Sequence, residues 1–448
     1  MKLLTVSALI VSIASCNDNI ILDPISQLDS AAGYTTKSDI EAALTGCYSS
    51  IQSGNYMGLR YFIFADLYAD NISHVGTFPS FAEIANKNIL PNNTELSNMW
   101  ANIYSGINRM NNVINSAPAI EDKALNTSVV LGEARGLRAF QYFNLLRYYG
   151  GSETGFNKSD GKGVPLVLKP TLVSADTTPL PRVTEAEVWK QILDDLQFAE
   201  DNLPTNNGGL GRLNKRSARA LKARAYLYRG EWSQAEVVAD SVITKGGYSL
   251  LTGANYANIW LLQNSSESIF ELLFDASNTN SIAFFYYPTS LGGRNEISSS
   301  AALNTAHEAN DVRKAVNYTA SPAAKTLKFT RVAGTDNVVL LRLAEMYLIR
   351  AEARAMQNKL VDALADLNVI RVRAGLTPSA AATQADLLTA IEKERRIELA
   401  HEGHRWFDVR RYNKLTSVGI TQPFRALWPI PDREVKTSGN VISQNAGY

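Results

Sequence analysis

Two histidines and a glutamate fall within four consecutive residues, His401-Glu402-Gly403-His404, and side chains of these types could bind zinc. The helical zinc-protease motif places its two histidines four residues apart, so that both lie on one face of the helix. Here the two histidines are three residues apart, and Gly403 weakens a helix between them. The chain has only two other histidines. We therefore expect no metal site and no cofactor.

Acidic and basic side chains alternate in the same region, where two carboxylates could act as the acid and the nucleophile of a glycosidase. Glu394, Glu398 and Glu402 fall near one helix face, with arginines close in the sequence. A neighbouring arginine lowers the pKa of a carboxyl group, which is the wrong direction for a general acid. The pattern favours an ion-paired network that supports a helical frame, so no catalytic residue is expected. The expected network comprises Glu392, Glu394, Glu398, Glu402, Arg395, Arg396, Arg405, Arg410 and Arg411.

Two segments combine aromatic side chains with amide, acidic and basic groups, a mixture that suits sugar recognition. One segment runs over residues 66–81, and the other contains Phe284-Phe285-Tyr286-Tyr287. Either pair of these four aromatics could face outward, and any single ring could instead be buried under its loop. The candidate ligand-binding residues are Asp70, Asn71, His74, Phe78, Phe81, Tyr286, Tyr287 and Arg294.

The first cysteine of the chain, Cys16, follows an apolar run over residues 3–13. Such a run is too short to span a bilayer and is typical of a signal peptide. The small residues before the cysteine complete what looks like a bacterial lipobox, in which cleavage frees the cysteine and its sulfur receives lipid. We expect residues 1–15 to be a lipoprotein signal peptide and residues 16–33 a lipidated tether that anchors the chain to a membrane. An ordinary secretory signal with a chance cysteine is the alternative.

Helical patterns begin after this tether. A helix is predicted from about Thr36, with Thr36 or Ser38 as its N-cap. A second helix is predicted over residues 94–115, where apolar residues recur at helical spacing, so Trp100 is expected in the core. Cys47 lies in the first helix and is expected to be a small buried apolar residue.

Small residues recur in two later segments, each time on both sides of a short turn. This spacing is typical of tetratricopeptide-like helical hairpins, in which small residues let helices pack closely. Residues 150–181 and 248–331 interrupt the helical pattern, and loops on a rigid frame often carry binding sites. We predict a mostly α-helical single domain over residues 34–448, with tetratricopeptide-like hairpins, irregular loops and a few short strands. The corresponding alanines are Ala223, Ala225 and Ala235 in one segment and Ala351, Ala353 and Ala363 in the other.

Charge and composition exclude one class of partner. The chain has 44 basic and 43 acidic residues, so it lacks the basic excess with which proteins bind nucleic acid. Hydrophobic residues make up 45% of the chain, enough for a large core. No later segment approaches the apolar length of about 18 residues that a spanning helix needs.

Several motifs together resemble the SusD/RagB family of nutrient-binding outer-membrane lipoproteins. The strongest is the run over residues 394–411. In this chain Ala446 stands where the family usually has proline, and a polar insertion, Ser152–Lys162, divides one motif. The other matching segments are Tyr104–Asn112, Glu133–Ala139, Gly163–Val167, Leu427–Pro431 and Gln444–Tyr448.

This resemblance implies a function and partners. Such proteins sit over a TonB-dependent outer-membrane transporter (SusC-like) and act as a hinged lid on the cell surface. They capture oligosaccharides, or in some cases oligopeptides, without cleaving them. In resembling proteins, the regions of the two candidate segments contribute to the binding face, and Asp70 matches an acidic residue common in the family. A carbohydrate-cleaving lipoprotein and a repeat scaffold without a small ligand remain as alternatives.

Overall fold

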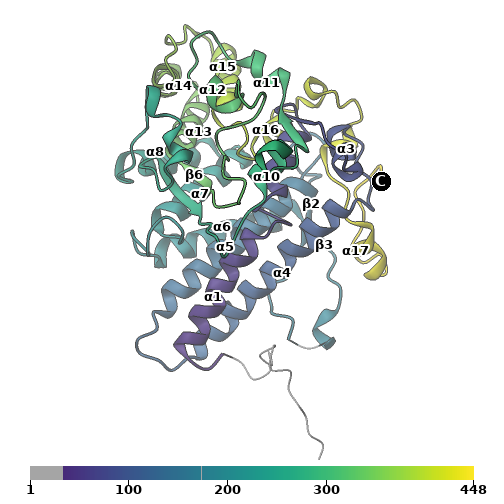
Figure 1. Ribbon diagram of the computed structural model, residues 1–448. Helices are drawn as coiled ribbons and strands as arrows, with labels where there is room; N and C mark the ends of the chain where they lie inside the picture. The colour runs from purple at the N-terminus through teal and green to yellow at the C-terminus, as the bar shows by residue number, and fades with distance from the viewer. Residues whose placement is uncertain (1–33, 173) are drawn as a thin grey trace, which may run out of the picture. The chain divides into compact units, whose positions relative to one another are not determined.

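Helices dominate residues 34–172 and 174–448, the part of the chain that the computed structural model describes. This part contains 17 α-helices and six short strands (Figure 1). The predicted mostly α-helical class is confirmed. The expected signal peptide, the lipidation site Cys16 and the tether all lie outside the described residues, which begin at Tyr34.

Long helices of the first half of the chain pack side by side (Figure 1). The first of them, α1 (Lys37–Gln52), has Thr36 as its N-cap, and the Thr36 hydroxyl accepts a hydrogen bond from the Asp39 amide. The Asp39 carboxylate accepts one from the Thr36 amide in return, which completes a capping box. The next long helices are α4 (Thr94–Ser116), α5 (Thr127–Tyr149) and α6 (Glu185–Asn202).

The interior of this helical layer matches the predictions for two residues. Trp100 of α4 is 2% exposed, and Cys47 of α1 is fully buried. Trp100 packs its ring against Tyr149 with a centroid distance of 4.8 Å. Both residues are therefore part of the core, as the helical spacing predicts.

Two helical hairpins form the frame of the second half. One joins α7 (Lys215–Arg229) to α8 (Trp232–Lys245), and the other joins α13 (Leu343–Met356) to α14 (Leu360–Arg373). Helix α13 also packs against α8 and against α15 (Gln384–Glu398). The six alanines of the repeated pattern are at most 1% exposed, which confirms that small residues line these helix contacts.

The strands form three two-stranded antiparallel sheets. They pair β1 (Ile72–His74) with β5 (Ile297–Ser299), β2 (Lys162–Pro165) with β3 (Arg182–Thr184), and β4 (Ser268–Leu272) with β6 (Val338–Arg342). Residues 150–181 and 248–331, which interrupt the helical pattern, contain β2, β4 and β5 among loops and short helices. The short helices are α2 (Arg60–Leu67), α3 (Pro79–Ala85), α9 (Asn258–Leu261), α10 (Ile282–Tyr286), α11 (Ala301–Ala306), α12 (Arg313–Asn317), α16 (Arg405–Arg411) and α17 (Asp432–Thr437).

Buried ion pairs join the C-terminal helices to the rest of the frame. Glu398 lies 2.5 Å from Arg342 and 3.1 Å from Arg313, and it also pairs with Arg373. Burial alone would raise the pKa of Glu398, but Arg373, Arg342 and Arg313 hold it well below its usual range. A carboxylate in this state is a poor proton donor. The supporting role that the sequence predicts for this glutamate is confirmed.

The pairing differs from the sequence pattern in one respect. Glu394, Glu398 and Glu402 pair with basic residues from other elements and not with the arginines of the run. The arginines of the run bind Asp408, Asp70, Glu352, Glu392 or backbone carbonyls instead. Arg395 pairs with Asp408 at 3.0 Å, and Arg410 donates hydrogen bonds to the backbone carbonyls of Gly150 and Ser152. Helix α15 packs against α13, α14, α11 and α12, and this tertiary packing supplies partners that the sequence spacing does not show.

Candidate functional site

The two candidate ligand-binding segments meet at a small sheet. Strand β1 follows the loop that contains Asp70, and it pairs with β5, so that His74 lies opposite Ile297. Just before β5, the backbone carbonyl of Glu296 accepts hydrogen bonds from the amides of Val75 and Gly76, each at 3.0 Å. Segments more than 200 residues apart in the sequence therefore form one surface.

The Glu296 side chain ties these segments together. Its carboxylate accepts hydrogen bonds from His74 Nε2 at 2.8 Å, from the Phe78 amide at 2.6 Å and from Arg294 Nε at 3.1 Å. Burial raises the pKa of Glu296, but the donors around it, the Phe78 amide first, lower it below the usual value overall. A Cβ at Gly76 would lie 2.3 Å from this carboxylate, so only glycine permits the close approach.

Aromatic rings run from the core to this surface. Phe81 packs against Phe64 of the core with a centroid distance of 5.1 Å and stacks on Phe285 at 5.6 Å. Phe285 in turn contacts Phe284 at 5.8 Å, and Phe284 is 37% exposed. The packed rings hold Phe284 at the surface, since each ring is fixed by the one beneath it.

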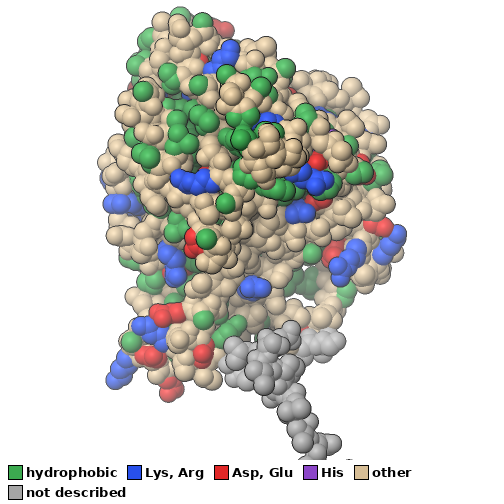
Figure 2. Space-filling view, viewed as in Figure 1, with side chains coloured by type: hydrophobic (Ala, Val, Ile, Leu, Met, Phe, Trp, Pro, Cys, Tyr) green, Lys and Arg blue, Asp and Glu red, His purple; other side chains and the backbone are tan. Residues whose placement is uncertain are grey.

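A hollow of about 360 Å³ opens beside Phe284, and we call it the α10 hollow. Its polar groups include Arg294, whose guanidinium lies 3.7 Å from the centre of the Phe78 ring. Figure 2 shows hydrophobic side chains around α10 with charged side chains at one edge of them. The hollow is lined by Gly76, Thr77, Phe284, Thr289, Gly293, Arg294 and Glu296.

Four of the candidate residues do not face this hollow. Asn71 is fully buried, Phe81 and Tyr286 are each 1% exposed, and Tyr287 is 7% exposed. Their polar atoms bond within the chain: the Tyr286 hydroxyl meets His401 Nδ1 at 2.8 Å, and the Tyr287 hydroxyl donates to the Thr326 carbonyl. These four side chains are buried beside the hollow and do not line it, so their contact with a ligand stays a prediction.

Asp70 also has a supporting position. Its carboxylate lies 2.9 Å from Arg396 of α15 and 2.8 Å from Arg405 of α16. Its backbone carbonyl accepts a hydrogen bond from Ser300 at 2.6 Å. These contacts fix the loop before β1 to the C-terminal helices. The Asp70 carboxylate, which the sequence suggests as a ligand contact, is thereby paired with two arginines of the chain itself.

The candidates that remain at the hollow or its edge are His74, Phe78 and Arg294. Sequence reasoning left open whether Phe284 faces outward and did not include it among the candidates, and it missed Glu296. Phe284 had a usable signal, because in a helix Ile282, Ala283 and Tyr286 share the buried face and Phe284 points away from it. Glu296 carries no such signal, since its role depends on the approach of a distant strand.

The chemistry available in the α10 hollow is recognition by stacking and hydrogen bonding. Of its lining residues, Glu296 is the one carboxylate, and three donors engage it. A glycosidase needs a second carboxyl group about 5–10 Å away across the bond to be cut. An exposed ring with an arginine and two threonine hydroxyls instead suits the ring face and hydroxyl groups of a sugar.

The two histidines of the motif over residues 401–404 are buried. His401 lies at φ +64°, and its Nε2 is 3.0 Å from the Asn317 carbonyl. Burial lowers the pKa of His401 to about 3, so its ring is neutral at physiological pH. Within residues 34–172 and 174–448, no group of His, Cys, Asp or Glu side chains is arranged to hold a metal ion. Among these residues, no helix is long and apolar enough to cross a membrane.

Family comparisons agree with this architecture. A model described as the SusD family matches residues 274–422, and a model described as starch-binding associating with outer membrane matches residues 22–227. SusD-like protein P2 of Formosa agariphila is 24% identical, and the match covers 99% of both chains. The chain belongs to the SusD family.

Solved structures show the same fold. A SusD superfamily protein from Bacteroides vulgatus has a TM-score of 0.79 at 27% identity, with 93% of this chain and 100% of that chain covered. A laminarin-binding SusD-like protein has a TM-score of 0.77 at 25% identity, with the same coverage. The overall fold is thus shared with these proteins.

Proposed function

We propose that this protein is a cell-surface lipoprotein that captures oligosaccharides in the α10 hollow and passes them to a TonB-dependent outer-membrane transporter. The observation that carries the proposal is the exposed Phe284 ring beside Arg294, with hydroxyl groups of Thr77 and Thr289 in the same hollow. Family membership and the name of the laminarin-binding relative support a glycan as the ligand.

The state of the carboxylate in the hollow supports capture without cleavage. Glu296 accepts hydrogen bonds from His74, Phe78 and Arg294, and its lowered pKa keeps it ionised. It therefore orders the loops and does not donate a proton to a glycosidic bond. Oligopeptides are the alternative ligand, and they would use the same hollow.

Binding by wild-type protein and two variants tests the proposal. The purified protein is screened on a glycan array, and the best ligand is titrated by calorimetry. Phe284→Ala should weaken binding by about tenfold or more, because the exposed ring face is lost while the half-buried Phe285 beneath it remains. The matched control is Leu262→Ala, which removes an apolar side chain that is 70% exposed and does not line the hollow.

The outcomes separate the candidate ligands. Loss of glycan binding in Phe284→Ala and normal binding in Leu262→Ala support the proposal. Equal affinity in all three proteins would contradict the assignment of the hollow. If the protein retains oligopeptides but no glycan, the ligand of the hollow is an oligopeptide and not an oligosaccharide.

A further inference from the structure

The polar insertion Ser152–Lys162, which divides a family motif in this chain, has a defined structure. At its base, the backbones of Gly151 and Lys162 exchange hydrogen bonds of 2.8 and 3.1 Å. Within it, Ser152 Oγ donates to Asp160 at 3.0 Å, and the Asn157 amide donates to Glu185 at 2.6 Å. The insertion is therefore fixed against the helical frame.

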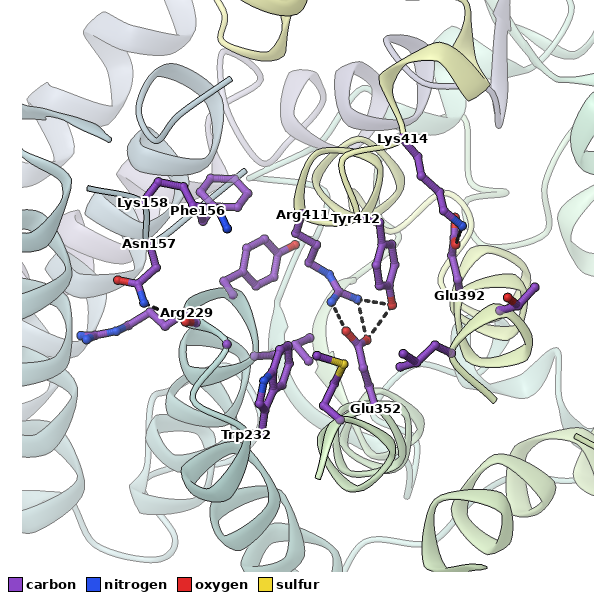
Figure 3. A pocket seen from close by; sticks show the side chains of 16 residues that line it. Phe156, Asn157, Lys158, Arg229, Trp232, Glu352, Glu392, Arg411, Tyr412 and Lys414 are labelled. Atoms are coloured by element: carbon purple, nitrogen blue, oxygen red, sulfur yellow. Dashed lines mark hydrogen bonds and ion pairs between the residues drawn. The ribbon is translucent and has the colours of Figure 1, made fainter. Parts of the chain in front are cut away.

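This insertion forms one wall of a second pocket, which we call the insertion pocket, of about 330 Å³. The other walls come from the α7–α8 hairpin, from α13 and α15, and from α16 and the residues after it. Phe156 of the insertion is 5% exposed and packs edge-on against Tyr228 at 5.5 Å. Figure 3 shows Trp232 at the base, between the insertion on one side and Tyr412 on the other.

The acid nearest this base is already neutralised. Both terminal nitrogens of Arg411 bind the Glu352 carboxylate, one of them at 2.7 Å, and the Tyr412 hydroxyl donates to it at 2.7 Å. Burial raises the pKa of Tyr412, so the phenol keeps the proton that it donates. Glu352 is 1% exposed, and its charge is compensated within the pocket wall.

The remaining charge of the insertion pocket is positive. Four basic and two acidic side chains line it. The Lys158 amine has no hydrogen bond or ion pair within the described residues, and it lies on the exposed rim. Beside it, Arg229 pairs with Glu231 at 2.5 Å, but its buried Nε has no hydrogen-bond partner in the described chain. Lys158 and Arg229 lie on the same side of the pocket (Figure 3).

We propose that the insertion pocket binds an acidic sugar unit that carries a carboxylate or a sulfate group. The sugar ring lies against Trp232 and Tyr412, and the anionic group faces Lys158 and Arg229. The volume fits a small ligand, since such pockets usually begin at about 300 Å³. The choice of a sugar rests on the proposed function, whereas the charge and the aromatic base belong to the pocket itself.

Calorimetry with defined probes tests this second site. The probes are an oligogalacturonate, a sulfated carrageenan oligosaccharide, a neutral laminari-oligosaccharide and hexaglutamate. Lys158→Glu should weaken binding of at least one acidic sugar by about tenfold, because it reverses the charge of the lining amine that has no partner within the described residues. Trp232→Leu should weaken it to a similar extent while it keeps an apolar side chain in place. Lys123→Glu, at an exposed lysine that lines neither hollow, is the matched charge control and should have no effect.

The variant Phe284→Ala separates this proposal from the proposed function. Acidic-sugar binding that survives Phe284→Ala and is lost in Lys158→Glu assigns it to the insertion pocket, even if the α10 hollow binds nothing. Preference for one of the two acidic sugars identifies the anionic group. No binding of either acidic sugar, equal losses in Lys158→Glu and Lys123→Glu, or binding of hexaglutamate alone would overturn the proposal.

Discussion

At the scale of single residues, one buried carboxyl group near the site has an unusual pKa. Asp66 is fully buried beneath the loop that leads to β1, where it accepts hydrogen bonds from Asn71 Nδ2 at 2.7 Å and from the Gly403 amide at 3.2 Å. Burial raises the pKa of Asp66 from its usual 3.8 to about 7. The base of the α10 region therefore contains a carboxyl group that titrates near neutral pH.

Replacement of this carboxyl group should change the pH dependence of stability. The folded state keeps the Asp66 proton up to about pH 7, whereas the unfolded state loses it near pH 4. The free energy of unfolding therefore falls as the pH rises between these values, by up to about 1.4 kcal/mol per pH unit from this group. Asp66→Asn should remove that slope, so that the variant gains stability relative to the wild type between pH 5 and pH 7.5 in urea unfolding. A difference that does not change with pH would contradict this prediction.

At the scale of elements, close helix contacts keep the loops in place. Helix α13 lies in the middle of the frame, with α8, α14 and α15 packed against it. Gly230 ends α7 at φ +69°, a left-handed conformation that glycine adopts without strain, and the chain turns directly into α8. The α7–α8 hairpin also supplies Tyr228 and Trp232 to the insertion pocket, so the same packing positions a binding surface.

A larger side chain at a helix contact should destabilise the frame. Ala353 of α13 is fully buried among packed helices. Ala353→Leu should lower the free energy of unfolding by about 1–3 kcal/mol, because the added methylenes have no space. The control is Ala365→Leu, at an exposed position of α14, which should change stability by less than about 0.5 kcal/mol. Equal effects of the two changes in denaturant unfolding would show that the contact is not close-packed.

Sequence periodicity predicted most of these helical elements but fewer of the contacts at the candidate site. Thr36 as an N-cap, Trp100 in the core and the alanines of the hairpins depend on local spacing, which a sequence displays directly. The role of Glu296 and the burial of Tyr286 depend on contacts between segments more than 100 residues apart. Such contacts have no local signature, so the sequence could single out the two segments that meet at the candidate site but not the side chains that face the hollow.

At the scale of the whole molecule, the model that matches residues 22–227 is described as associating with the outer membrane, which agrees with the proposed attachment to that membrane. The described chain has no helix that could span a membrane, and the proposed attachment is lipid on Cys16. Several acyl chains bind a membrane firmly, because each buried methylene contributes about 0.8 kcal/mol.

Removal of the lipid acceptor should release the protein from membranes. Cys16→Ala should move the protein from the membrane fraction to the soluble fraction of lysed cells. Cys47→Ala is the matched control, since this second cysteine is fully buried in α1, and it should leave the protein on the membrane. Full retention of Cys16→Ala in the membrane fraction would refute the lipid anchor.

The fate of a bound oligosaccharide tests the central claim most directly. The purified protein is incubated with an end-labelled form of its best array ligand, and the sugar is recovered and sized by chromatography. We predict that the wild-type protein retains the oligosaccharide at its original length and that Phe284→Ala retains much less of it. Shortened products that persist after repeated purification would contradict binding without cleavage.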